Sequence, residues 1–459
     1  MSGPNGPRRV LIENATVVTV NDRDDVLRPG WVEVRDGAIA AVSGTPLPAQ
    51  AGDRRIDAGG KVVMPGLVNA HTHLFQTFIR GVYEHLPFTD WLRRIYHCGR
   101  ALTAEDCRLS AMLGSLESLK GGVTTVMDHQ FLNRGVELPE ATLEGMRAVG
   151  VRTVLARTIM DVGTLAPPEV IESPGEGLRA VQSLLDNHRR DGGGMLTLMT
   201  GPNTPGVSAS GELAVAVQRF AADRGLGVSA HVAESRSIVD AVRERTGHHG
   251  VVRWLDALGA LGSNWIAPHS VHVSAGEIDI YAGRGVRVCH NPVSNMTLGD
   301  GIAPVVEMLR AGLTVALGTD GAASNNSQDM FEVVKTAALL QRVRLQDSHA
   351  LLPAQALRMA TINGARALGL DGLVGSLEVG KRADLIVLDL LAAPHNVAVH
   401  DVVSHLVHCA RATDVRLVMV DGRILMEDRS VAGLDEAGLL GRAQEAAERL
   451  VARLGEPSP

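Results

Sequence analysis

Short apolar runs recur along the middle of the chain, and stretches with helical spacing of apolar residues separate them. Strands that alternate with helices predict a parallel sheet. The strand ends from His73 to Asp320 span about 250 residues, the usual scale of a (β/α)8 barrel. We therefore predict an α/β protein with a TIM barrel, and a doubly wound open sheet is the alternative. The eight expected strands lie in VVMPGLVNAHTH, VTTVMDH, VRTVLART, MLTLMTGP, GVSAHVAE, WIAPHSVH, VRVCHNP and TVALGTDG.

The two ends of the chain have a different pattern, in which short β-branched runs alternate with polar residues between turn signals. Residues 9–44 contain Asn-Asp, Pro-Gly and Asp-Gly turns, and residues 375–390 and 415–431 have a similar texture. We predict that both ends together form a small β-sandwich-like domain. The expected boundaries are 1–64 and 371–431 for this domain, 65–370 for the barrel, and 432–459 for a C-terminal helix and tail.

The composition narrows the class of protein. The chain has 459 residues, of which 45% are hydrophobic and 21% charged, as is typical of a folded soluble protein. A formal net charge of −7 and 3% aromatic residues argue against nucleic acid and against an anionic membrane as partners. The composition leaves the oligomeric state open, a dimer or a higher homo-oligomer included.

The cysteines and the start of the chain bear on its location. Four cysteines with no paired short spacing cannot form a disulfide framework, and they fit a reducing compartment. The start, MSGPNGPRRV, runs into a strand-like segment without an apolar stretch of the signal-peptide kind. We therefore expect a cytoplasmic protein.

Polar side chains with metal-ligating chemistry stand where several apolar runs end. His71 and His73 are two residues apart, so a strand presents both imidazoles on one face, about 7 Å apart along the chain. In a barrel, side chains at strand ends project into one carboxyl-terminal rim. Three neutral imidazoles and one carboxylate suit Zn²⁺, with Fe²⁺ as the second choice. The other residues in such positions are His231, Glu234, His269 and Asp320.

A divalent ion in such a site leaves room for a bound water, whose pKa falls toward about 7. A carboxylate beside that water must then shuttle the proton to the leaving group, and Glu234 suits this role. The alternative interpretation of Glu234 is an exposed acid in the first turn of a helix, where the helix dipole favours it.

Other chemistries are excluded by their missing motifs. The sequence has no H-E-x-x-H of a metalloprotease helix, no P-C-x-x-C paired with H-x-E, and no phosphate-binding G-x-x-x-x-G-K-[ST]. His129, His272 and His290 also lie near predicted strand ends. We interpret these three histidines as structural or as partners of the ligands, with substrate contact as the alternative.

The chain resembles the amidohydrolase superfamily over about residues 9–430. It is similar to the branch that holds triazine hydrolases, guanine and 8-oxoguanine deaminases, and adenosine-type nucleoside deaminases. The motifs that carry the resemblance are MPGLVNAHTH, GGVTTVMDH, SAHVAES, HNPVSNMTLGDGIAPV, LGTDGAASNNSQDMF and GSLEVGKRADLIVLD. The resemblance implies one metal, Zn²⁺ or Fe²⁺, held by His71, His73, His231 and Asp320.

The same resemblance implies a reaction, the hydrolytic displacement of an exocyclic amino group from an aromatic nitrogen heterocycle. In that reaction Asp320 takes a proton from the attacking water, and Glu234 protonates a ring nitrogen and then the departing ammonia. His269, on the sixth strand, orients the water and stabilises the developing oxyanion.

Two details bear on the substrate. In HTHLFQ, Gln76 resembles a glutamine of guanine and 8-oxoguanine deaminases whose amide binds a purine edge, and a surface glutamine is the alternative. Nucleoside deaminases of the branch carry an acid for the ribose hydroxyls where this chain has WLRRIYHCGRALT, with no acid. We therefore expect a free purine-, pyrimidine- or triazine-like base. A 5′-methylthioadenosine- or S-adenosylhomocysteine-like nucleoside deaminase, or a triazine chlorohydrolase or N-alkylaminohydrolase, is the alternative, since GTDGAASNNSQDMF is shared with the nucleoside group.

Two other classes remain for comparison. A cyclic-amide hydrolase of the hydantoinase type needs a bridging lysine on the fourth strand, and MLTLMTGP has none. A barrel that only binds a heterocycle has no need of Glu234 beside a full set of ligands.

Overall fold

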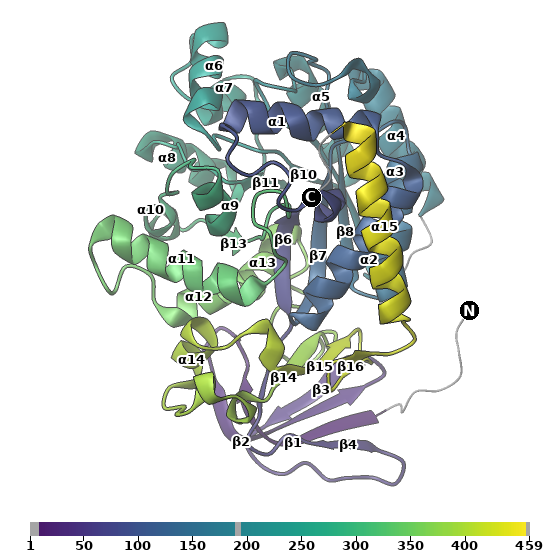
Figure 1. The fold of residues 1–459 in the computed structure, drawn as a ribbon. Helices are drawn as coiled ribbons and strands as arrows, with labels where there is room; N and C mark the ends of the chain where they lie inside the picture. Colours follow the sequence, from purple (N-terminus) through teal and green to yellow (C-terminus); the bar gives the residue numbers. More distant parts are fainter. Residues whose placement is uncertain (1–8, 189–193, 456–459) are drawn as a thin grey trace.

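The computed structural model describes residues 9–188 and 194–455, so the beginning of the MSGPNGPRRV segment and the end of the C-terminal tail lie outside the described residues. Eight parallel strands follow one another in chain order, each hydrogen-bonded to the next (Figure 1). The backbone N–H of Asp320 donates to the carbonyl of His71 at 2.9 Å, just beyond the last strand, and this contact joins the two ends of the sheet. The predicted TIM barrel is therefore confirmed over the open sheet, and each of the eight predicted segments holds one strand of the barrel. The strands are β6 (Leu67–Thr72), β7 (Val123–Gln130), β8 (Arg152–Ile159), β9 (Leu196–Pro202), β10 (Gly227–Ser229), β11 (Trp265–Pro268), β12 (Arg287–His290) and β13 (Val315–Leu317).

Helices surround this barrel and connect its strands (Figure 1). Local sequence signals explain several of their ends: Thr103 and Asp106 form a capping box at the start of α2, and Gly225 ends α5 in a left-handed conformation. The helices are α1 (Phe88–His97), α2 (Ala104–Lys120), α3 (Glu137–Val149), α4 (Pro174–Asn187), α5 (Gly211–Arg224), α6 (Arg236–Thr246), α7 (Val251–Ala257), α8 (Ala275–Arg284), α9 (Pro292–Thr297), α10 (Val305–Arg310), α11 (Met330–Leu345), α12 (Pro353–Met359), α13 (Ile362–Leu368), α14 (Val402–His408) and α15 (Glu436–Leu454). Short 3-10 helices are η1 (Leu74–Ile79), η2 (Cys98–Arg100), η3 (Pro168–Val170), η4 (Leu390–Ala392), η5 (Pro394–Asn396) and η6 (Ala412–Asp414).

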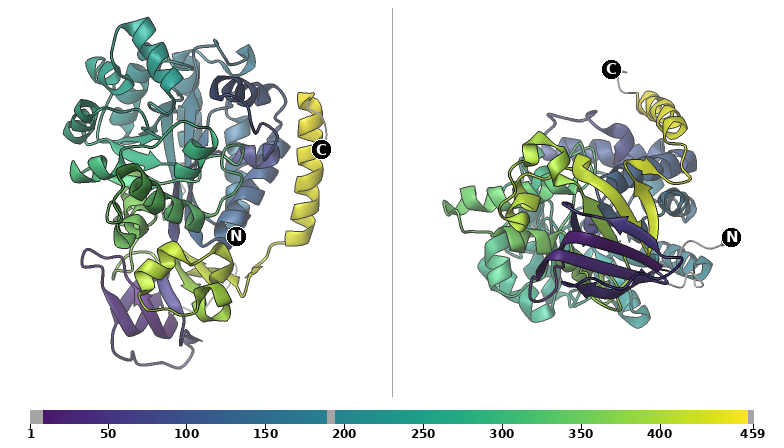
Figure 2. Two further views of the ribbon diagram at one scale, coloured as in Figure 1. Left: turned by 60° about the vertical axis from the view of Figure 1, so that its left-hand side comes forward. Right: turned by 90° about the horizontal axis from the view of Figure 1, so that it is seen from below.

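The second sheet combines the two ends of the chain, as the sequence predicts. It is a mixed sheet in which β14 pairs with β5, so that the N-terminal strands continue directly into the C-terminal strands. The view from below in Figure 2 shows the purple and yellow-green strands side by side beneath the barrel. Residues of both ends share one apolar cluster, which includes Ile12, Val32 and Leu385. Its strands are β1 (Arg9–Val18), β2 (Val26–Arg35), β3 (Ala38–Ser43), β4 (Arg54–Asp57), β5 (Val62–Pro65), β14 (Leu385–Leu388), β15 (Val415–Val420), β16 (Arg423–Glu427) and β17 (Ser430–Val431).

A buried ion pair ties the barrel to the small sheet. Arg152, the first residue of β8, donates through Nε and Nη2 to the two carboxylate oxygens of Asp384, at 2.9 and 2.8 Å. Both side chains are fully buried, so this two-fold contact fixes the barrel and the residue before β14 in one geometry.

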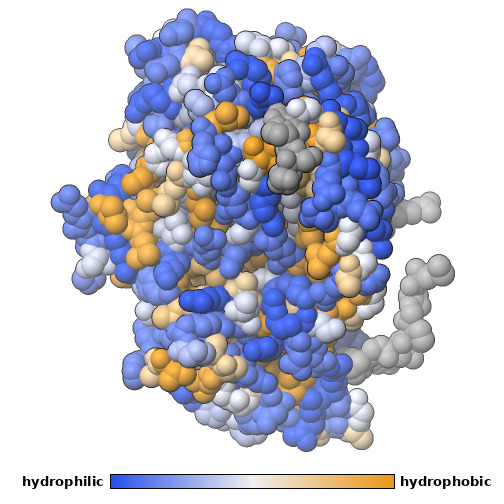
Figure 3. Space-filling view, in the orientation of Figure 1, coloured by the Kyte–Doolittle hydropathy of each residue, from blue (hydrophilic) through white to orange (hydrophobic). Residues whose placement is uncertain are grey.

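The last helix, α15, runs along the outside of the barrel (Figure 2) and contacts α2. Leu439 and Leu450 are buried in this contact. Figure 3 shows a mostly hydrophilic surface with hydrophobic residues gathered near α11, where Leu339 and Val343 are exposed. Within the described parts of the chain, every helix is too short or too polar to traverse a bilayer.

Candidate active site

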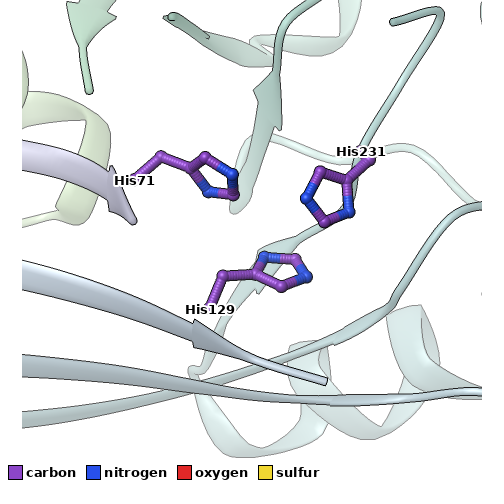
Figure 4. A group of neighbouring side chains, drawn as sticks. All are labelled: His71, His129 and His231. Atoms are coloured by element: carbon purple, nitrogen blue, oxygen red, sulfur yellow. The ribbon is translucent and has the colours of Figure 1, made fainter. Parts of the chain in front are cut away.

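The sequence singles out seven residues as metal ligands, catalytic groups or substrate contacts. Six of them follow the carboxyl ends of barrel strands, and His71 is the second-last residue of β6. All seven are buried, and the structure brings them together in one place. Figure 4 shows the imidazoles of His71, His129 and His231 pointing toward a common centre from β6, β7 and the segment after β10. The seven residues are His71, His73, Gln76, His231, Glu234, His269 and Asp320.

The rings of His73 and His231 face each other through their Nε2 atoms, which lie 3.2 Å apart. The Nδ1 atom of His73 lies 2.7 Å from the backbone oxygen of His129, and that of His231 lies 3.1 Å from the backbone oxygen of Asn203. A carbonyl oxygen only accepts, so each Nδ1 carries the proton and each Nε2 presents a lone pair. Two lone pairs at this distance repel each other unless a cation lies between them.

His71 and Asp320 complete the same cluster. The Oδ1 atom of Asp320 lies 3.2 Å from His73 Nε2 and 3.5 Å from His71 Nε2. Neither ring nitrogen of His71 has a hydrogen-bond partner among the described residues, and burial lowers the pKa of His71 to about 4, so its ring is neutral at neutral pH. Ligand atoms of His71, His269 and Asp320, and likewise of His71, His129 and His231, lie within 4.8 Å of one another.

These groups fit a divalent metal ion. Buried imidazole lone pairs and a carboxylate oxygen converge without protons to share, and the opposite nitrogens of two of the rings are fixed by backbone carbonyls, as is common for metal-ligating histidines. A single cation at their centre would give a partner to buried polar atoms such as His71 Nε2, which has no hydrogen-bond partner among the described residues.

His129 joins the cluster but has less to offer an ion. Its Nε2 lies 3.2 Å from the side-chain oxygen of Asn203 and its Nδ1 lies 3.0 Å from Ser229 Oγ, so both ring nitrogens have protein partners. Its carbonyl also orients His73. The positions of His272 and His290 differ: His272 bonds the backbone oxygen of Asp300 at the rim, and the ring of His290 is buried without a partner among the described residues.

Glu234 and His269 form the second half of the site. The Oε1 atom of Glu234 lies 3.5 Å from His269 Nε2, which also lies 3.9 Å from Asp320 Oδ2. Burial, helped by the charges of Asp300 and Asp320, raises the pKa of Glu234 well above its usual value. Burial also lowers the pKa of His269 to about 3. Burial therefore favours the protonated carboxyl of Glu234 and the neutral imidazole of His269.

A narrow cavity of about 20 Å³ opens onto these groups. Gln76 lines it: its Oε1 accepts from the backbone N–H of Ala323 at 3.3 Å, while its Nε2 has no partner among the described residues. The sequence alternative of a surface glutamine is therefore wrong, because Gln76 is 1% exposed. The other lining residues include Trp91, Leu92, Ile95, Tyr96, Phe131, Asn203 and Thr204.

Several residues of the site had no assigned role in the sequence. Tyr96 and Asn203 form part of the cavity wall and bond each other, with Asn203 Nδ2 donating to Tyr96 Oη at 3.1 Å. Asn295 and Asp300 lie beside His269 and Glu234. In the sequence, Asn203, Asn295 and Asp300 are marked only as polar residues in segments that follow a strand, GPNTP and SNMTLGD. Such segments are also frequent in ordinary loops.

A parallel barrel with buried histidines and a carboxylate at its carboxyl end defines a metal-assisted hydrolase of the TIM-barrel class. The chain belongs to the amidohydrolase family, whose sequence model matches residues 62–425. It is 39% identical to the 5′-deoxyadenosine deaminase of Methanosarcina mazei, over 97% of this chain and 99% of that protein. It is also 39% identical to a 5-methylthioadenosine/S-adenosylhomocysteine deaminase of Pelotomaculum thermopropionicum, with the same coverage.

Solved structures with a similar fold agree with these sequence comparisons. An adenosine deaminase from Xanthomonas campestris with bound zinc is 32% identical and covers 98% of this chain and 100% of its own, with a TM-score of 0.89. The zinc complex of an atrazine chlorohydrolase from Arthrobacter aurescens is 27% identical, covers 95% and 100%, and has a TM-score of 0.89. The chain is thus a hydrolase that acts on carbon–nitrogen bonds other than peptide bonds, as the sequence predicts.

Proposed function

We propose that this chain is a zinc-dependent deaminase of an adenosine-type nucleoside whose 5′ position carries an apolar group. The reaction replaces the exocyclic amino group by hydroxyl and releases ammonia. One observation carries the choice of a nucleoside: a second, larger cavity of about 320 Å³ lies beside the first, and Leu92 lines both.

The second cavity has mainly apolar walls. Phe88, Leu165, Val207 and Ile238 line it, whereas its two charged residues, Glu244 and Arg245, are exposed. A base held against the histidine cluster directs the rest of a nucleoside away from it, and an apolar 5′ substituent then reaches this second cavity. The deaminases named above support the proposal, since 5′-deoxyadenosine and 5′-methylthioadenosine carry an apolar group at the 5′ position.

The polar wall of the inner cavity suits a ribose. Tyr96 Oη lies 3.1 Å from Ser208 Oγ and 3.4 Å from Thr204 Oγ1, so hydroxyl and amide groups gather at one side. These groups offer hydrogen bonds to sugar hydroxyls in place of an acid. Gln76 offers its unpartnered amide nitrogen to an acceptor on the base.

We assign the catalytic roles from the geometry. Glu234, whose buried site favours the protonated form, donates a proton to a ring nitrogen of the base. It then takes up the proton that Asp320 removes from the water and passes it to the leaving amino group, which departs as ammonia. Asp320 has Oδ2 fixed by Ser294 Oγ at 2.6 Å, and it accepts a proton from the attacking water. His269 Nε2 lies between the two acids and donates to the oxygen on which negative charge develops.

His71, His73, His231 and Asp320 would hold the zinc ion, with Fe²⁺ as the second choice. When bound, the ion lowers the pKa of a coordinated water toward about 7 and so provides a nucleophile at neutral pH. The zinc complexes among the related structures support the choice of metal.

A free base is the second candidate. The sequence favours it because no acid occupies the WLRRIYHCGRALT segment. At one position of this segment the structure leaves no room for an acid, since a side chain on Gly99 would place its Cβ 2.4 Å from Val170 Cγ1. Gln76 lines the cavity, as a base-binding residue must.

We also propose the domain boundaries and the cellular location that the sequence predicts. The boundaries 1–64 and 371–431, 65–370, and 432–459 divide the chain into sheet domain, barrel and C-terminal helix with its tail. A cytoplasmic location is supported by the cysteines, of which Cys107, Cys289 and Cys409 are free.

The proposal is tested by ammonia release from a panel of substrates with the zinc-loaded protein. The panel holds 5′-deoxyadenosine, 5′-methylthioadenosine, S-adenosylhomocysteine, adenosine, adenine, guanine and aminated triazines. The proposal requires the highest kcat/KM for the nucleosides with an apolar 5′ group. A free base with a higher kcat/KM supports the second candidate, and no ammonia from any of them rejects both.

A further inference from the structure

The two ring nitrogens of His269 have different surroundings. Its Nε2 faces Glu234 and Asp320 in the cavity and has no hydrogen-bond partner among the described residues. Its Nδ1 faces away from the cavity, toward α9. There the side-chain nitrogen of Asn295 lies 3.1 Å away, and that of Asn291 lies 3.4 Å away.

The partners of Nδ1 decide where the ring proton lies. An amide nitrogen donates and does not accept, so His269 Nδ1 must present its lone pair to Asn295 and Asn291. A neutral imidazole carries one proton, which is therefore on Nε2. This is the tautomer that can donate a hydrogen bond into the cavity.

The orientation of the Asn295 amide has its own support. Its nitrogen also lies 3.3 Å from Oδ2 of Asp300, and its oxygen has no partner among the described residues. If the amide were turned around, its oxygen would face the carboxylate of Asp300, which repels it. Asp300 thus selects the donor side of the amide.

We propose that Asn295 is a positioning residue that holds His269 in the Nε2-protonated tautomer, and that Asp300 holds the Asn295 amide in the required orientation. The three residues form a chain from the acceptor Asp300 through the donor Asn295 to the acceptor Nδ1. The opposite tautomer would direct a lone pair at the developing negative charge, and the transition state would lose a donor.

The first measurement is the tautomer of His269 in the wild-type, metal-free protein. Nitrogen chemical shifts of isotope-labelled histidine side chains separate protonated from unprotonated ring nitrogens, and the signals of His269 are assigned by their loss in His269→Gln. The proposal requires a protonated Nε2 and an unprotonated Nδ1. A protonated Nδ1, or an even mixture of tautomers, overturns it.

The second measurement uses Asn295→Asp, which replaces a donor by an acceptor of the same shape. The proton should move to Nδ1, and kcat should fall by about 10–100-fold, a usual effect of changing the partner of a site histidine. KM and bound zinc should change little. An unchanged tautomer, or an unchanged kcat, contradicts the proposal. Asp300→Ala removes the acceptor that orients the amide, so it should give a mixture of tautomers and a smaller loss of kcat; an unchanged tautomer removes Asp300 from the chain.

A matched control exists elsewhere in the chain. Asn396 is buried and lies between two histidine rings, 3.2 Å from His395 Nε2 and 3.0 Å from His405 Nε2, far from the cavity lining. Asn396→Asp makes the same chemical change and should leave the His269 tautomer and kcat unaltered. The kcat readout rests on the proposed function, but the tautomer does not. A protein that deaminates no heterocycle therefore rejects the function without touching the tautomer result.

Discussion

The Nε2 atoms of His73 and His231 lie 3.2 Å apart, although backbone carbonyls hold the proton of each ring on the opposite nitrogen. This close approach of two lone pairs is favourable only if a cation occupies the space between them. Asp320 Oδ1, 3.2 Å from His73 Nε2, adds a negative charge at the same point. This arrangement connects the sequence motif His71-Thr-His73 to metal-assisted hydrolysis.

Glu234→Gln tests the proton shuttle. Glutamine keeps the shape of the side chain but cannot pass on a proton, so kcat should fall by at least about 10²-fold. The metal content, measured by elemental analysis, should stay the same because Glu234 is outside the proposed ligand set. A variant that loses its metal, and regains full activity when the metal is restored, would show that the assignment is wrong.

The pH profile of kcat should reflect the raised pKa of Glu234. Burial, with the charges of Asp300 and Asp320, raises this pKa, and the protonated form is the active acid. The rate should therefore fall as the pH rises through the raised pKa of Glu234. Asp300→Asn should move this fall to lower pH, since it removes one neighbouring charge. A profile without an alkaline fall would contradict the role of Glu234 as an acid.

Gln76→Ala tests contact with the base. The amide nitrogen of Gln76 is buried without a partner among the described residues, and an unpaired polar edge on the substrate costs about 1–3 kcal/mol. The value of kcat/KM should drop by about one to two powers of ten. Gln341→Ala is the control, because Gln341 is also buried but donates to the carbonyl of Ala303, outside the cavity lining. Equal effects of the two variants would remove Gln76 from the substrate site.

Val207→Asp tests the second cavity. A carboxylate in this apolar wall should lower kcat/KM for 5′-deoxyadenosine and 5′-methylthioadenosine by about 10–100-fold, the scale of one or two lost apolar contacts. Turnover of adenine should not change, because a free base does not reach Val207. The isosteric variant Val207→Thr should show a smaller loss in the same direction. If the variants affect base and nucleoside alike, the second cavity is not the site of the 5′ group.

The barrel and the histidine cluster could be predicted from the sequence because both depend on local patterns. An apolar run that ends in a polar residue marks a strand and its rim position, and the parallel order then places His71, His231 and Asp320 together without further information. The pairing of the two chain ends into one sheet follows from their shared alternation, although the register of β5 with β14 had no signal in either segment.

The support of the site could not be predicted in this way. Asn295 reaches His269 because α9 packs against the end of β11, and a single sequence does not reveal this packing. The second cavity arises where α1, α6 and the segment around Leu165 meet, and these are distant in the chain. His129 has the position of a ligand, but its partners are Ser229 of β10 and Asn203, the residue after β9, which are distant in the chain.

The most direct test of the account is a titration of the metal-free protein with Zn²⁺ while ammonia release from 5′-deoxyadenosine is measured. The rate should rise linearly and level off at one zinc ion per chain, and His71→Ala should bind no ion tightly, while His349→Ala, at an exposed histidine, behaves like wild type. Full activity without metal, or a rate that levels off only at two ions per chain, would contradict the single site formed by His71, His73, His231 and Asp320.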